Sequence, residues 1–153
     1  MHILLPDARI HRHLIDSLYV EAMVLADEAR SYFDDIGRAE RDVLSPMQRV
    51  TFSCESLKVT TRLMHVIAWL LTQRAVHAGE LSPTQAVEPS RRLGDDPVTE
   101  AAVVDALPPE AQRMIATSID LHRRVRRLDD AQAQTMPQPS PARSMLDRLT
   151  MSL

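Results

Sequence analysis

Residues 46–78 limit the fold most, because no proline or glycine interrupts the chain between Pro46 and Gly79. Ser45 precedes this stretch as an expected N-cap, and Gln48 stands where it would complete a capping box. Gly79 is the residue type best able to end a helix in the left-handed conformation. A helix over residues 46–78 would be roughly 50 Å long and would need packing partners along its whole length.

Apolar residues occupy two sides of this predicted helix. One side has alternating steps of four and three residues, the pattern of a helical bundle: Val50, Cys54, Leu57, Thr61, Met64, Ala68, Leu71, Ala75 and Ala78. The other side carries Phe52, Val59, Leu63, Val66 and Leu70, with Ile67 and Trp69 beside them. A helix that is apolar on most sides is buried on more than one face. We therefore expect a homodimer with an interface at Val59, Leu63, Val66, Trp69 and Leu70, and we expect Cys54 to be buried.

The composition indicates an all-α protein, since glycine and aromatic residues are scarce and no strand pattern is present. A chain of 153 residues is long enough for one domain with a hydrophobic core. The net charge of -3 gives no general attraction to nucleic acid or to an anionic membrane. No apolar run approaches the length of a membrane span, and the apolar start of the chain is short. These features predict a cytoplasmic protein.

Two further amphipathic helices are expected, over residues 11–36 and 110–132. Gly37 follows the first as a stop signal, and Pro108 and Pro109 precede the second. The connection 80–108 is mostly irregular, with short helical turns before Pro89 and within residues 99–106, and is long enough to cross the bundle from end to end. We therefore predict an up-down three-helix bundle over residues 1–132 with one very long central helix.

Residues 133–153 differ from the rest of the chain, because three prolines fall within residues 137–141. We expect a flexible proline-rich tail. Its apolar end could place Met145, Leu146 and Leu149 on one helical face, which suits a short motif that binds a partner protein.

The sequence contains no pattern typical of a catalytic or metal site. No glutamate is followed by a histidine three residues later, and phosphate-binding loops and nucleophile elbows are absent. We predict no cofactor, no metal and no enzymatic activity. Two alternatives are a ligand sensor or enzyme that uses Glu55, Arg62 and His65, and a DNA-binding regulator. The DNA-binding regulator would use the arginines Arg123, Arg124, Arg126 and Arg127.

Several segments resemble a known family of small alphaproteobacterial proteins. They are 18–23 (LYVEAM), 25–33 (LADEARSYF), 54–64 (CESLKVTTRLM), 68–71 (AWLL), 73–76 (QRAV) with Gly79 and Glu80, and 126–129 (RRLD). The chain resembles the regulator of CtrA degradation family, which is RcdA-like and was formerly DUF1465. The resemblance covers most of residues 14–130, and the tail cannot be matched residue by residue.

This resemblance implies a dimeric three-helix bundle without catalytic activity. Such proteins are adaptors that help to deliver cell-cycle regulators to the ClpXP protease at the cell pole. Their partners are a receiver-domain primer protein, the substrate regulators and further adaptors that respond to cyclic di-GMP. From the net charge and the lack of a long apolar run, we also predict no nucleic-acid partner and no insertion into a membrane.

Overall fold

The computed structural model describes residues 4–135 and 141–152, and within them the ordered elements are all helical. The elements are α1 (Leu4–Ser31), the π-helix η1 (Tyr32–Ile36), α2 (Arg38–Asp42), α3 (Pro46–His77), α4 (Pro83–Ala86), the 3-10 helix η2 (Pro89–Arg91), α5 (Ala101–Val104), α6 (Pro109–Thr135) and α7 (Pro141–Met151). Helices α1, α3 and α6 are much longer than the others. The prediction of an all-α protein with three long helices is confirmed.

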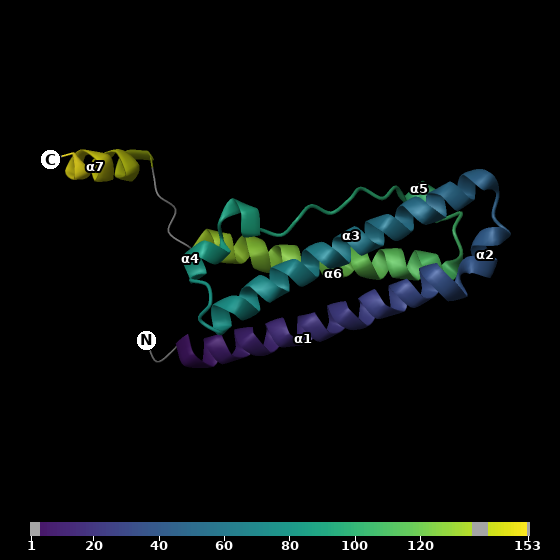
Figure 1. Cartoon of the computed structure of the whole chain (residues 1–153), viewed down its shortest axis with the longest axis horizontal. Helices are drawn as coiled ribbons and strands as arrows, with labels where there is room; N and C mark the ends of the chain where they lie inside the picture. Colours follow the sequence, from purple (N-terminus) through teal and green to yellow (C-terminus); the bar gives the residue numbers. More distant parts are fainter. Residues whose placement is uncertain (1–3, 136–140, 153) are drawn as a thin grey trace.

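The three long helices lie side by side in a bundle, with α3 antiparallel to α1 and parallel to α6 (Figure 1). Contacts between α1 and α3 reverse in order along the chain, as in the ion pair of Asp16 with Arg74. Trp69 and Gln73 of α3 bind residues of α6 that follow in the same order. This parallel pair is possible because residues 78–108 return along the full length of the bundle, as their length suggested.

Both ends of α3 are fixed by the residues that the sequence indicated. The Gln48 backbone N–H donates to Ser45 Oγ at 3.3 Å, and the Ser45 N–H donates to Gln48 Oε1 at 3.1 Å. At the other end, Gly79 has a φ of 77°, in the left-handed region that a residue with a Cβ rarely adopts. The capping box and the glycine stop are therefore confirmed.

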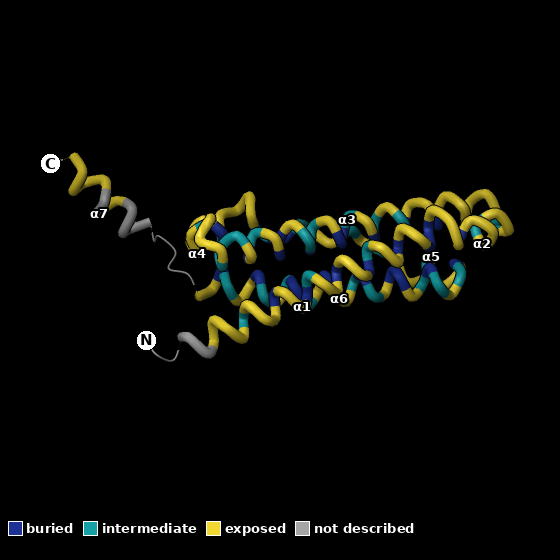
Figure 2. The backbone as a smooth tube through the Cα atoms, turned by 60° about the horizontal axis from the view of Figure 1, so that its bottom comes forward, coloured by how far each residue is buried: buried dark blue, intermediate teal, exposed yellow. Residues whose placement is uncertain are grey.

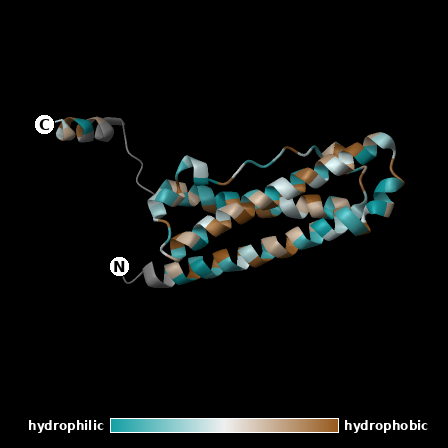
Figure 3. Cartoon of the chain, in the orientation of Figure 1, coloured by the Kyte–Doolittle hydropathy of each residue, from teal (hydrophilic) through white to brown (hydrophobic). Residues whose placement is uncertain are grey.

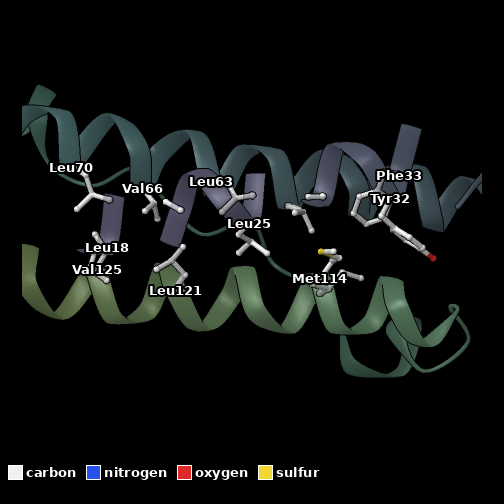
Figure 4. Close-up of a cluster of buried hydrophobic side chains, with 14 of the residues drawn as sticks. Leu18, Leu25, Tyr32, Phe33, Leu63, Val66, Leu70, Met114, Leu121 and Val125 are labelled. Carbon is white, nitrogen blue, oxygen red and sulfur yellow. The ribbon is translucent and has the colours of Figure 1, made fainter. Parts of the chain in front are cut away.

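The core runs between α1, α3 and α6 (Figures 2 and 4). It contains Leu18, Leu25, Leu121 and Val125, and an aromatic group closes it where η1 meets α3. In that group the rings of Phe33 and Phe52 contact edge to face, with centroids 5.3 Å apart. Such contacts add to the free energy gained by burying the rings.

The predicted dimer interface is wrong in its position, because its residues belong to this core. Val59, Val66 and Leu70 have no exposed surface, and Leu63 and Trp69 expose only 3% and 2%. They pack against α1 and α6 of the same chain and are not available to a second subunit. The prediction that Cys54 is buried is also wrong, because its side chain is exposed.

The boundaries of the other long helices differ in informative ways. Helix α1 begins earlier than expected, since a proline such as Pro6 is tolerated in a first helical turn. On α1, Ile15 is buried and Leu14 is exposed, and Ile36 at the end of η1 is also exposed. Gly37 has a φ of -78°, so it is not a left-handed stop. A Cβ at Gly37 would lie 2.7 Å from the Tyr32 carbonyl oxygen, so the π-turn requires a residue without a side chain.

Helix α6 continues to Thr135, past the predicted boundary at residue 132, and Ala133 is buried. The centre of the expected proline-rich linker, residues 136–140, lies outside the described residues. None of the helices in the described part of the chain has the length and apolar character needed to cross a bilayer.

Candidate interaction surfaces

A buried polar network holds an extended segment, residues 93–99, against α3 and α6; we call this segment the strap. The Arg62 guanidinium has no exposed surface and donates to Asp96 Oδ1 at 2.5 Å and to the Pro97 carbonyl at 2.8 Å. Thr99 Oγ1 donates to Glu55 Oε1 at 2.6 Å, and Lys58 Nζ lies 2.8 Å from the other Glu55 oxygen. The charged groups on this side of α3 are therefore neutralised by the chain itself.

The start of the strap and Arg92, which immediately precedes it, are held by α6. Asp129 is 1% exposed and accepts from Trp69 Nε1 at 2.9 Å and from Arg92 Nε at 2.8 Å. The Gly94 carbonyl accepts from His122 Nε2 at 2.7 Å, assigning the ring proton to that nitrogen. Buried polar groups are nearly always paired in this way, because an unpaired one costs free energy.

Glu55, Arg62 and His65, which the sequence suggested as a polar group, do lie together. They contact the strap of the same chain. His65 Nδ1 lies 2.9 Å from the Asp95 carbonyl oxygen, which adds a further contact to the strap. Sequence reasoning missed Asp96, Thr99 and Asp129 as partners. The seven-residue spacing of Glu55, Arg62 and Trp69 was the available signal, since it places them on one side of α3.

The arginines of α6 do not form one free basic surface. Arg124 pairs with Glu21 of α1 and with Asp120, and Arg126 donates to the Gly94 carbonyl at 3.2 Å. Within the described residues, Arg123 and Arg127 are the exposed members of this cluster and have no ion-pair partner. Nor do three or more His, Cys, Asp or Glu side chains of the described residues group closely enough to hold a metal ion.

The exposed side of α3 carries an apolar stripe with heptad spacing. We call it the outer stripe and define it as Val50, Cys54, Leu57, Thr61, Met64, Ala68, Leu71 and Ala75. Val50, Leu57, Met64 and Leu71 are 58%, 68%, 64% and 47% exposed. Hydrophobic segments recur along the whole length of α3 (Figure 3). A long apolar stripe on the surface of a helix is typical of a protein-binding surface.

A groove of about 340 Å³ lies beside the outer stripe, between α1 and α3. We call it the α1–α3 groove. Its apolar lining is Ala26, Ala29, Phe33, Leu63, Met64 and Ile67, and its polar lining is Arg30, Asp34, Ser56 and Thr60. An apolar hollow with a few polar groups is the usual form of a site that binds a side chain or a small ligand.

The predicted apolar residues of the tail lie on α7, beyond the end of the bundle where α6 ends (Figure 1). Met145, Leu146 and Leu149 are 64%, 64% and 60% exposed. The structure thus provides exposed apolar side chains on α3 and on α7. Their part in binding other proteins stays a prediction.

Comparisons with known proteins agree with this architecture. Residues 7–153 match the family described as "Protein of unknown function (DUF1465)". No curated protein sequence matches the chain. Among solved structures, the chain is similar to the crystal structure of RcdA from Caulobacter crescentus CB15, with 35% sequence identity and a TM-score of 0.65. The similarity covers 80% of this chain and 93% of that chain.

Proposed function

The chain belongs to the DUF1465 family, and on that premise we propose that it is a non-catalytic adaptor that delivers cell-cycle regulators to the ClpXP protease. The observation that carries this proposal is the exposed apolar surface of α3 and α7. The buried charges of the bundle, by contrast, are paired with groups of the same chain. The exposed apolar surfaces can bind other proteins, whereas the buried polar groups bind the strap of the same chain. The likeness to RcdA supports the same reading.

The mechanism that we propose is tethering. One surface of the adaptor binds a substrate regulator, and another binds ClpXP together with a receiver-domain primer protein at the cell pole. Linked binding raises the local concentration of the substrate at the protease to the order of millimolar. Met145, Leu146 and Leu149 at the end of the chain would supply one of these contacts.

We also propose that the adaptor is a homodimer, with the interface moved from the buried residues to the outer stripe. If two α3 helices pack antiparallel, Val50 faces Ala75 and Leu57 faces Ala68 of the second copy. Met64 then faces Thr61, and Leu71 faces Cys54. Every large residue therefore meets a small one, as close packing of helices requires. A two-fold axis between Arg62 and Leu63 generates this arrangement, and it uses the same surface on both copies.

The function is tested with purified ClpXP, the primer protein and a candidate cell-cycle regulator. We expect degradation to accelerate when this protein is added, and only when the primer is also present. The variant Leu146→Asp/Leu149→Asp should reduce the acceleration, whereas Met151→Asp, on another side of α7, should leave it unchanged. A folded wild-type protein that accelerates no candidate substrate would contradict the proposal.

A further inference from the structure

An exposed apolar groove and a helix with exposed apolar side chains occur together in the part of the chain that the structure describes. The α1–α3 groove is open to solvent beside Met64, and α7 exposes Met145, Leu146 and Leu149. A helix of eleven residues is marginal in water, because most helical stability in proteins comes from packing of the apolar face. The apolar side chains of α7 would therefore be buried if the helix packed into the apolar groove.

We propose that α7 is a ligand for the α1–α3 groove of its own chain, and that it competes there with apolar helices of partner proteins. This is the helix-in-groove mode of recognition, in which apolar anchors at helical spacing enter an apolar channel. The inference rests on the fold and does not depend on the adaptor function.

Chain length permits this docking. Gln132 pairs with Gln73, so α6 ends near the level of Val76 on α3. The near edge of the groove at Ile67 is nine residues from that level, or about 14 Å along the helix, and packed helix axes lie about 8–10 Å apart, so the straight distance is about 17 Å. The six steps from Thr135 to Pro141 can span at most about 20 Å.

The length of α7 also matches the groove. Its eleven residues extend about 16 Å. The groove follows α3 from Ile67 back to Ser56, a distance of about 16 Å by the same helical rise. An α7 that enters at Ile67 would therefore cover the groove along its length.

The charges of the two parts are complementary. Asp34 lies in the groove lining and is exposed, and within the described residues it has no ion-pair partner. Arg30 does not compensate it, because Arg30 pairs with Asp27 at 3.1 Å. The α7 sequence contains Arg143 and Arg148 against Asp147, which gives it a net charge of +1 (two minus one). Opposite charges beside an apolar contact favour one orientation of the docked helix.

Docking of this kind would regulate access to the groove. While α7 occupies the groove, a partner helix must displace it, so the apparent affinity for the partner is reduced by the occupied fraction. A partner that enters the groove would in turn free α7 for a second protein. The groove and the tail would therefore be coupled.

Spin labelling tests the docking in the full chain. A nitroxide is attached to Ser152→Cys in a Cys54→Ala background, and broadening of amide NMR signals from Thr60, Met64 and Ile67 is measured. We expect broadening that is lost in Leu146→Asp/Leu149→Asp and kept in Met151→Asp. Equal signals in all variants would overturn the proposal. Broadening seen only between a spin-labelled chain and a separate isotope-labelled chain would overturn docking within one chain.

A peptide measurement provides a second test. A fluorescein-labelled peptide of residues 141–153 is titrated with the full chain, and binding is followed by anisotropy. We expect Leu146→Asp/Leu149→Asp to bind the peptide about ten-fold more tightly than the wild type, because its own α7 no longer competes. In that background, Thr60→Glu in the groove should abolish binding, and Ala116→Glu on α6 should not. Equal affinities, or no binding at about 1 mM protein, would contradict the proposal.

Discussion

Arg62 shows how one buried charge fixes a distant segment of this chain. Its guanidinium binds Asp96, Pro97, Thr99 and Ser118, which come from the strap and from α6. A planar guanidinium can make several directed hydrogen bonds at once, and a lysine ammonium cannot reproduce that geometry. The strap therefore depends on an arginine at this position.

Replacing Arg62 with methionine should destabilise the protein by about 1–3 kcal/mol, the usual cost of leaving buried hydrogen-bonding groups without a partner; its ion-pair partner Asp96 is itself 37% exposed. The substitution leaves the strap residues without their main donor. The free energy of unfolding is measured by urea denaturation. Arg30→Met is the matched control, because the Arg30–Asp27 pair is highly exposed and should contribute at most about 1 kcal/mol. Similar losses for both variants would contradict this role of Arg62.

A second residue-scale feature is the contact between two histidines that joins the start of α1 to the end of α3. His11 Nδ1 lies 3.1 Å from His77 Nε2, and the rings meet edge to face. Burial lowers the pKa of both imidazoles from 6.5. His11 and Arg12 lower the pKa of His77 further, while Asp16 opposes this effect. The folded chain therefore holds both rings neutral more strongly than the unfolded chain does.

This pair should make the stability fall as the pH drops below about 6.5. The unfolded chain binds protons there more readily than the folded chain, so the stabilisation is complete above 6.5 and is lost toward the lowered pKa values. The urea midpoint is measured between pH 7.5 and pH 5. His11→Gln/His77→Gln should have a smaller pH dependence than His13→Gln, which changes an exposed residue on the same helix. An equal pH dependence would show that the pair has no such role.

At the scale of elements, the strap and α3 come into very close contact at Gly94. A Cβ at Gly94 would lie 2.5 Å from His65 Cγ, well inside the contact distance of two carbons. The same glycine offers its carbonyl to His122 and Arg126 of α6. The strap thus lies between α3 and α6, and its distance from α3 is set by a residue without a side chain.

Gly94→Ala should destabilise the bundle by about 1–3 kcal/mol, which is typical of overpacking. The loss should shrink when His65 is also replaced by alanine, because the clashing ring is then absent. Urea denaturation of the two single variants and the double variant gives the coupling between the two sites. Additive losses would mean that Gly94 is required for another reason.

At the scale of the whole molecule, the two sides of α3 have different partners. The side with Val59, Leu63, Val66 and Leu70 packs inside the chain, and the outer stripe is free for another protein. Substitutions on the two sides of α3 should therefore have different effects. A charge in the core should destroy the fold, whereas a charge on the outer stripe should leave the fold intact and prevent the proposed dimer.

Leu57→Glu/Leu71→Glu should yield a folded monomer, and Leu63→Asp should yield an unfolded protein. Light scattering measures the mass, and circular dichroism measures the helix content. The antiparallel register adds a sharper expectation, since Leu71→Cys should form an intermolecular disulfide with Cys54 under oxidation. Leu71→Cys in a Cys54→Ala background is the control and should not crosslink. A wild-type crosslink through Cys54 alone would indicate a parallel pair instead.

The sequence by itself determined the elements of this protein. Caps, stop signals and helical periodicity act over a few residues, so Ser45, Gln48 and Gly79 were sufficient to place both ends of α3. The spacing of apolar residues also showed that α3 has two apolar sides. These features are local, because they depend on interactions between residues that are close in the sequence.

Only the tertiary structure decided which apolar side of α3 is internal and what the buried charges do. Both sides have helical spacing, and the choice depends on where α1, α6 and the strap pack. Arg62 and Glu55 find their partners more than thirty residues away, in a segment without periodicity. Burial is a property of the assembled chain, so no local pattern could distinguish the core face from the outer stripe.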